Sequence, residues 1–212
     1  MKDNILTKIN IVAVVGTRPN FVKMRSVIRS LDEIGYNVIL VHTGQHYDKN
    51  MSKSFFEDLE LPDPNFFLDV NKGSRGTQIA RVIMEFDKVC QELNPAMVIV
   101  AGDVNSTLAC ALSAYTNGIK VAHVESGLRS FDLEMPEEMN RILTDKLSNL
   151  LFVTEKSGLS NLENEGFDMK NTHFVGNSMI DSLKVYLKKA IDSKPWENYG
   201  IEKGNYCLVT LH

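Results

Sequence analysis

The sequence has few cysteines, no long apolar run and no signal-like start. Cys90, Cys110 and Cys207 are its three cysteines, and no Cys-x-x-Cys pair occurs. Their odd number and wide spacing exclude a disulfide framework and a zinc knuckle, and favour buried free thiols in a reducing compartment. The apolar runs are strand-sized, short of the ~20 residues that a membrane helix needs, and residues 1–10 lack an apolar signal core. We therefore expect a soluble cytoplasmic protein with no membrane partner.

A basic surplus is also absent. The chain has 23 Lys and Arg against 27 Asp and Glu, for a formal net charge of −4, whereas nucleic-acid binders usually carry excess positive charge. We therefore expect no nucleic-acid partner. Hydrophobic residues make up 43% and charged residues 24% of the chain, which excludes a disordered tail, a collagen-like fibre and a coiled coil.

Short apolar runs alternate with longer amphipathic segments. This alternation predicts parallel strands joined by helices, and runs that are apolar on both faces indicate a sheet covered by helices on both sides. We expect one α/β domain with a doubly wound, Rossmann-like fold. The predicted strands span 9–15, 38–41, 66–70, 97–101, 121–124, 151–153 and 173–175, and the predicted helices span 21–34, 51–59, 77–93, 106–115, 136–147, 158–165 and 178–191.

The C-terminal segment has a different pattern. Residues 193–205 combine proline, glycine and charges, which predicts a linker. Residues 206–211 (YCLVTL) predict another buried strand, directly before His212. Because such a strand needs neighbours and covering helices, we expect a truncated chain. The predicted organisation is an N-terminal Rossmann-like domain over 1–192, a linker over 193–205 and the first strand of a C-terminal domain over 206–212.

A polar cluster follows the first predicted strand, where open α/β sheets bind ligands. Gly16 permits a tight turn, and the next helix offers free N–H groups to an anion. Arg18 and Lys23 suit a phosphate. The absence of GxGxxG and Walker motifs argues against a dinucleotide or a P-loop. The alternative is that both cations are solvated charges at a helix start.

Carboxylates follow two further predicted strands. Asp103 comes after strand 97–101 and is expected to point into the crevice, unless it or Asn105 caps the next helix. Glu125 leaves an apolar strand end and needs a partner, for which Arg129 is the nearby candidate. The alternative there is a purely structural ion pair. Cations and carboxylates in one crevice suit a phosphorylated substrate that undergoes proton transfer.

Other polar residues have stronger structural explanations. Glu137 and Arg141 lie four residues apart at a helix start, a spacing that suits a surface pair. His42 and His46 flank a turn without an evident third ligand, so we expect no metal site. His173 begins a strand and is expected to be structural.

Six motifs occur in order along nearly the whole chain. They are GTRPNFVK (16–23), HTGQH (42–46), GDVNSTLA (102–109), HVESGLRS (123–130), MPEEMNRILTD (135–145) and FVGNSMID (174–181). The most specific feature is HVESGLRS followed closely by MPEEMNRILTD. Together the motifs resemble the UDP-N-acetylglucosamine 2-epimerase family.

The resemblance implies a fold and a reaction. The fold has two Rossmann-like domains facing a cleft, a GT-B-like (glycosyltransferase-like) architecture whose N-terminal half is this chain. The reaction interconverts UDP-N-acetylglucosamine and UDP-N-acetylmannosamine by elimination and re-addition of UDP, with no metal or other cofactor. The resemblance further implies a homodimer and a role in supplying precursors of surface polysaccharides.

Residue roles also follow from the resemblance. Asp103, Glu125 and Glu137 match the family's catalytic acids, with the base and the acid left open among them, and His212 matches a catalytic histidine of the second domain. Because half the cleft is absent, we expect the chain alone to be inactive. The implied substrate-binding residues are Arg18, Lys23, Gln45, His46 and Arg141.

Two departures from the family pattern bear on the substrate. Asn20 stands where many relatives have glutamate, which is also missing in some relatives that act on diacetamido-uronate sugars. Gln45 and His46 are followed by Tyr47 and Asp48, not by the arginine of relatives that have an activator site. A hydrolysing epimerase, a diacetamido-uronate epimerase and a glycosyltransferase of the same architecture are the alternatives.

Overall fold

The computed structural model describes residues 8–44, 56–202 and 204–210. Its centre is a seven-stranded parallel sheet with the order β3-β2-β1-β4-β5-β6-β7. This order confirms the doubly wound fold, because the chain builds outward in both directions from β1. The strands are β1 (Asn10–Val15), β2 (Asn37–His42), β3 (Phe66–Phe67), β4 (Met97–Ala101), β5 (Lys120–Ser126), β6 (Leu150–Val153) and β7 (Thr172–Phe174).

The helices fall where the amphipathic segments predict them. Residues 56–58 are helical and belong to the helix predicted at 51–59, the rest of which lies outside the described residues. No described helix is long and apolar enough to cross a membrane. The helices are α1 (Arg18–Glu33), α3 (Arg75–Leu93), α4 (Asn105–Thr116), α5 (Pro136–Leu147), α6 (Lys156–Asn164) and α7 (Ser178–Asp192), with short 3₁₀ helices η1 (Met169–Asn171) and η2 (Pro195–Tyr199).

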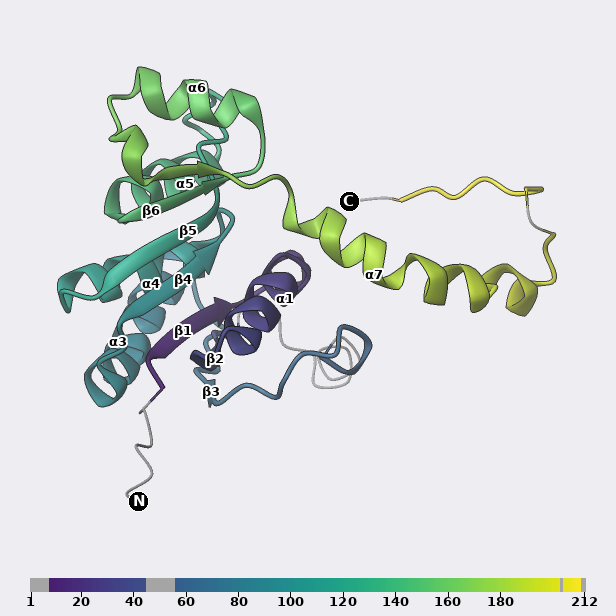
Figure 1. Cartoon of the computed structure of the whole chain (residues 1–212), viewed down its shortest axis with the longest axis horizontal. Coiled ribbons are helices and arrows are strands. Elements are labelled where there is room, and N and C mark those ends of the chain that lie inside the picture. Colours follow the sequence, from purple (N-terminus) through teal and green to yellow (C-terminus); the bar gives the residue numbers. More distant parts are fainter. Residues whose placement is uncertain (1–7, 45–55, 203, 211–212) are drawn as a thin grey trace.

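Helices cover both faces of the sheet (Figure 1). Successive side chains of a strand point to opposite faces. Val12 and Val14 of β1 therefore pack with Phe86 of α3 in one apolar layer, whereas Ala13 and Val15 pack in the other layer with α1. Because both sets are buried, β1 is apolar at every position from residue 11 to 15.

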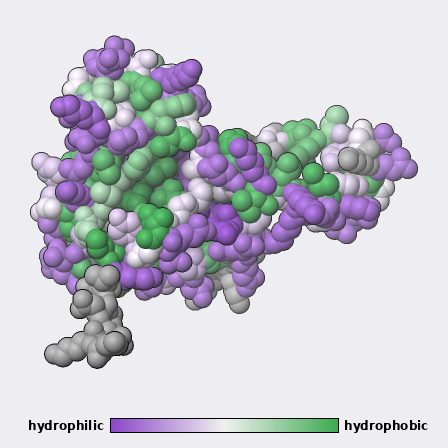
Figure 2. Space-filling model, in the orientation of Figure 1, coloured by the Kyte–Doolittle hydropathy of each residue, from purple (hydrophilic) through white to green (hydrophobic). Residues whose placement is uncertain are grey.

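An open apolar groove of about 330 Å³ lies between α1 and the β6–β7 side of the sheet. Its lining includes Val27 and Leu31 of α1, Phe152 of β6 and Val175. Figure 2 shows apolar side chains exposed on this face of the molecule. The helix cover is therefore less complete at this end of the sheet.

Helix α7 extends away from the sheet (Figure 1). Near its start, Ser182 Oγ donates a hydrogen bond to the carbonyl oxygen of Val22 in α1 (2.8 Å). Further along, Leu183, Leu187 and Ile191 are about half exposed. The helix is therefore held against α1 through Ser182 and Tyr186, and much of its apolar surface is left exposed.

The segment after α7 differs from the prediction. The predicted linker contains η2, and residues 206–210 form no strand and are exposed. Cys207 is accordingly exposed, whereas Cys90 and Cys110 are buried as predicted. Residues 206–210 are not a strand here because none of the described strands pairs with them. The predicted division into domains stays a prediction.

Candidate functional site

Polar side chains converge where the strand order reverses, at the carboxyl ends of β1, β4 and β5. Lys23 of α1 forms an ion pair with Glu125 at the end of β5. A side chain at Gly102, which follows β4, would come within 3.1 Å of Lys23 Nζ and 3.5 Å of Glu125 Oε2. Glycine at this position therefore leaves room for the ion pair, which lies beside Asp103.

The backbone turns Glu125 toward Lys23. The pairing of β5 with β6 shifts register between Val124 and Ser126, and Glu125 has a φ of +70°. Such a conformation is uncommon for a residue other than glycine and occurs often at functional sites. The prediction that Arg129 pairs with Glu125 is wrong, because the Arg129 guanidinium instead forms ion pairs with Asp145 and Glu165.

Asp103 has its own cation. Arg141 Nη2 contacts Asp103 Oδ2, and the two side chains are 11% and 23% exposed. The surface pair predicted between Glu137 and Arg141 is therefore wrong, because Arg141 turns inward to Asp103. Neither predicted helix cap is found, since the residue before α4 is Val104 and makes no side-chain cap.

Helix α5 carries Glu137, Asn140 and Arg141. Asn140 Nδ2 donates to the carbonyl oxygen of Asp103 (2.8 Å) and to Asn105 Oδ1 (3.1 Å). Glu137 lies in the first turn of α5 and is exposed. The structure thus brings together Lys23 with Glu125 and Arg141 with Asp103, as two ion pairs at the ends of neighbouring strands.

The loop between β1 and α1 is tied to the end of β4 by Asn20. Its Oδ1 accepts hydrogen bonds from the backbone N–H and the hydroxyl of Thr17 (3.1 and 2.6 Å), and its Nδ2 donates to the carbonyl oxygen of Ala101 (2.8 Å). A glutamate here would lack that donor. Asn20 is 3% exposed, so its role in this structure is to join the start of α1 to the end of β4. Arg18 is exposed at the first position of α1.

A buried network lies behind the carboxylates, and the motifs do not reveal it. His123 contacts Asp145 Oδ1 through Nδ1 (2.6 Å), and Asp145 Oδ2 accepts from Arg129 (2.8 Å) and from the Gly127 N–H (3.1 Å). Burial raises the pKa of Asp145, but the hydrogen bonds and charges of His123 and Arg129 outweigh burial and lower it. Both His123 and Asp145 lie in quoted motifs, yet only the fold places them in contact.

A second carboxylate that sequence reasoning missed shapes the loop after β5. Glu138 is buried and accepts hydrogen bonds from the backbone N–H groups of Ser130 (2.8 Å) and Phe131 (3.0 Å). Burial raises the pKa of Glu138, and these hydrogen bonds lower it by more. Of the paired glutamates in PEEMNR, the second therefore holds the loop, while Glu137 is left exposed.

The sequence predicted that His42 and His46 do not form a metal site. His42 is buried, its Nδ1 accepts from the Gly44 N–H (2.8 Å), and burial lowers its pKa to about 4. In the part of the chain that the structure describes, no three His, Cys, Asp or Glu side chains are placed to hold a metal ion. His173 is exposed, with its ring 5.9 Å from that of Phe152. Gln45, His46 and His212 lie outside the described residues.

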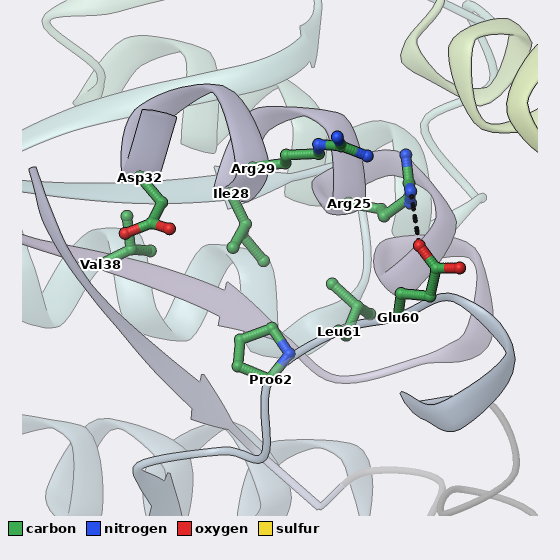
Figure 3. Close-up of a pocket in the computed structure, with 8 residues that line it drawn as sticks. All are labelled: Arg25, Ile28, Arg29, Asp32, Val38, Glu60, Leu61 and Pro62. Atoms are coloured by element: carbon green, nitrogen blue, oxygen red, sulfur yellow. Dashed lines mark hydrogen bonds and ion pairs between the residues drawn. The ribbon is translucent and has the colours of Figure 1, made fainter. Parts of the chain in front are cut away.

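A separate cavity of about 750 Å³ opens beside α1 (Figure 3). Arg25 and Glu60 form an ion pair at one side of it (3.4 Å), and Arg25 Nε also donates to the Tyr186 hydroxyl (2.8 Å) and the Leu59 carbonyl (3.2 Å). None of the predicted site residues that the structure describes lines this cavity. The candidate site is therefore the carboxyl edge of the sheet, where two carboxylates each lie beside a cation.

Comparison with known proteins shows which family the chain resembles. A family profile described as UDP-N-acetylglucosamine 2-epimerase matches residues 29–212. The chain is 44% identical over 202 residues to the UDP-N-acetylglucosamine 2-epimerase of Methanococcus maripaludis, covering 94% of this chain and 55% of that protein. It is 43% identical to the UDP-2,3-diacetamido-2,3-dideoxy-D-glucuronate 2-epimerase of Pseudomonas aeruginosa, covering 95% of this chain and 57% of that protein.

Solved structures show the same likeness. The fold matches the crystal structure of Methanocaldococcus jannaschii UDP-GlcNAc 2-epimerase in complex with UDP-GlcNAc and UDP, with a TM-score of 0.86 and 40% identity. That match covers 90% of this chain and 53% of that one, so the chain spans about half the length of the relatives it matches. On the profile match and these identities, the chain belongs to the UDP-N-acetylglucosamine 2-epimerase family.

Proposed function

We propose that this chain is the N-terminal half of an enzyme that inverts carbon 2 of a UDP-N-acetylhexosamine, converting UDP-N-acetylglucosamine to UDP-N-acetylmannosamine. The observation that carries the proposal is that Asp103 and Glu125 lie at the carboxyl ends of the neighbouring strands β4 and β5, each paired with a cation. Inversion of a carbon–hydrogen centre needs groups that move a proton at either face of the sugar. Two carboxylates from neighbouring strands meet that need.

The proposed reaction has two steps, elimination of UDP and its re-addition. A carboxylate takes the proton from carbon 2, the carbon–hydrogen electron pair forms the double bond between carbons 1 and 2, and the bond from carbon 1 to oxygen breaks as UDP leaves. In the second half a proton is delivered to the opposite face of carbon 2 and UDP re-adds at carbon 1. Asp103, Glu125 and Glu137 are the proposed acid and base groups, with His212 contributing from the start of the second domain.

Cations at the same edge suit the pyrophosphate of UDP. Arg18 and Lys23 lie in α1, whose N-terminus follows β1 directly, and a helix N-terminus favours an anion. Arg141 lies across the crevice on α5. We propose that these three, with Gln45 and His46, contact the UDP-sugar. A homodimer is part of the proposal, and no cofactor is required.

Two of the alternatives concern the reaction's details. The relative of Pseudomonas aeruginosa is named for a diacetamido-uronate sugar, and its identity to this chain nearly equals that of the relative named for N-acetylglucosamine. A hydrolysing branch would release free N-acetylmannosamine and UDP. A glycosyltransferase is disfavoured by the family match.

The test is proton NMR of the chain extended through its second domain, in deuterium oxide, with UDP-N-acetylglucosamine. UDP-N-acetylmannosamine with deuterium at carbon 2 supports the proposal. Free N-acetylmannosamine with UDP would instead establish the hydrolysing branch. If nothing changes, the diacetamido-uronate sugar is tested next, and inactivity on both overturns the proposal. The 212-residue chain alone, run in parallel, is expected to give no turnover.

A further inference from the structure

The surroundings of His123 determine the protonation of its ring. The side chain is fully buried, and Nε2 lies 2.7 Å from the carbonyl oxygen of Gly102. Since a carbonyl has no proton to give, Nε2 must carry one. On the other side, Nδ1 lies 2.6 Å from Asp145 Oδ1, so Nδ1 carries a proton as well wherever Asp145 is a carboxylate.

Asp145 is held as a carboxylate from its other oxygen. Oδ2 accepts from Arg129 Nη1 (2.8 Å) and from the Gly127 N–H (3.1 Å). Arg129 in turn makes two parallel hydrogen bonds to Glu165 (2.7 and 2.8 Å). The side chains of His123, Asp145, Arg129 and Glu165 are 0%, 0%, 1% and 30% exposed, so a row of alternating charges runs outward to a partly exposed carboxylate.

Alternation makes the burial of these charges tolerable, because each lies against a charge of opposite sign and its polar atoms are hydrogen-bonded. The groups facing the His123 ring are Asp145 from α5 and the Gly102 carbonyl from the turn after β4. A further charged pair joins Glu125, two residues after His123 on β5, to Lys23 of α1. No hydrogen-bond donor among the described residues faces the ring nitrogens.

This network reaches both candidate catalytic carboxylates. His123 holds the carbonyl of Gly102, whose next residue is Asp103. Asp145 holds the N–H of Gly127, two residues after Glu125. One buried pair therefore fixes the turn after β4 and the loop after β5 against each other.

We propose that His123 is an imidazolium at neutral pH and that, through its Nε2–H bond to Gly102, it is a positioning residue for Asp103. In this assignment His123 touches neither the sugar nor UDP. Asp145 supplies the negative charge that keeps both ring nitrogens protonated. The protonation state stands on the geometry alone, whereas the positioning role rests on the proposed function.

The protonation state is tested first, by NMR of the 212-residue chain labelled with ¹⁵N at histidine, from pH 6 to 8.5. His123 is expected to show two protonated ring nitrogens throughout. His42 is the internal comparison and is expected to show one bare nitrogen, since its Nδ1 accepts from Gly44. The Asp145→Asn variant assigns the signal, because a carboxamide donor opposite Nδ1 leaves a neutral ring. A bare nitrogen on His123 in the wild type at pH 7 overturns the proposal.

The positioning role is tested in the chain extended through its second domain. His123→Phe keeps the ring and removes the donor to Gly102, and is expected to lower kcat roughly 10- to 100-fold with KM changed less than about threefold. Asp145→Asn keeps the Nε2–H donor, and is expected to hold kcat within about threefold of wild type. A kcat unchanged in His123→Phe, or lowered equally in both variants, overturns the positioning role.

Controls separate this inference from the proposed function. Asp87→Asn changes a hydrogen-bonded carboxylate on α3, whose partners are Gln91 and Asn117, and is expected to leave kcat unchanged. If His123→Phe does not fold, His123→Gln replaces it, since its amide can donate to only one of the two acceptors. An extended chain without any epimerase activity contradicts the proposed function, while the NMR result still decides the protonation state.

Discussion

Two buried histidines, His42 at the end of β2 and His123 on β5, show how one residue type serves opposite purposes in one sheet. Both are fully buried near the carboxyl ends of apolar strands. The Gly44 N–H donates to His42, whereas Asp145 and a carbonyl accept from His123. A ring nitrogen that accepts a hydrogen bond carries no proton, so the His42 ring is neutral. A ring with an acceptor opposite each nitrogen must carry two protons, so the His123 ring is an imidazolium.

The difference extends to the regions around them. His42 lies among aromatic rings, with ring centroids 5.4 Å from Phe21 and 4.8 Å from Phe67. His123 lies in a row of charges that continues to Glu165. The β2 side is therefore stabilised by apolar packing, and the β5–α5 side holds the ion pairs that surround the candidate chemistry.

The largest expected effect tests whether chemistry belongs to the β5 side. In the chain extended through its second domain, Glu125→Gln removes a carboxylate that can transfer a proton, so kcat should fall roughly 10²- to 10⁴-fold. Deuterium incorporation at carbon 2 measures this. Glu163→Gln, on the exposed face of α6, is the matched control and should retain activity. Full activity in Glu125→Gln would remove Glu125 from the catalytic groups.

A stability measurement tests whether the buried contacts of Asp145 with His123 and Arg129 stabilise the fold through charge. Asp145→Ala removes the carboxylate that contacts His123, Arg129 and the Gly127 N–H and leaves these buried polar groups without it, so the free energy of unfolding should drop by about 3–5 kcal/mol. Urea unfolding followed by circular dichroism measures it. Asp87→Ala, at a partly buried carboxylate, should cost clearly less. Equal losses in the two variants would show that the network has no special dependence on charge.

The neutral state of His42 predicts a dependence on pH. Its folded pKa of about 4 lies below the ordinary value of 6.5, so the folded protein favours the neutral ring. The corresponding stability, about 3 kcal/mol at most, is fully present above pH 6.5 and is lost as the pH falls toward 4. In His42→Asn, whose Oδ1 can replace Nδ1 as the acceptor, this part of the acid loss should vanish. Parallel curves of unfolding free energy against pH for the two proteins would refute the assignment.

The smallest loss of stability is expected at Glu165, the partly exposed end of the row of charges formed by His123, Asp145, Arg129 and Glu165. The Glu165 side chain is 30% exposed, so water can compensate for part of what Glu165→Gln removes, and a loss of about 1 kcal/mol is expected. Urea unfolding beside Asp145→Ala provides the measurement. A loss as large as that of Asp145→Ala would mean that the outer end of the network matters as much as its buried centre.

Local patterns predicted most of the elements and the edge of the sheet where the candidate site lies. Alternating apolar runs place the strands and helices named above within a few residues of their observed bounds, whereas the strand predicted at 206–211 is absent from the described residues 206–210. The rule that ligands bind beyond the carboxyl ends of strands selects Lys23, Asp103 and Glu125 before any contact is known. Pairing was harder to predict. Arg129 is near Glu125 in sequence and Glu137 is one helical turn from Arg141, yet neither pair forms.

Fold class, family and the residue types at the crevice can all be predicted from the amino-acid sequence, because periodicity and motifs are read along the chain. Which charges meet depends on how the elements pack. A bulge at Glu125 turns that carboxylate to Lys23, and α5 carries Arg141 to Asp103 and Asp145 to His123 across 38 and 22 residues of sequence. The charge on each buried histidine depends on whether its neighbour is a donor or an acceptor, and that neighbour is placed by packing between elements.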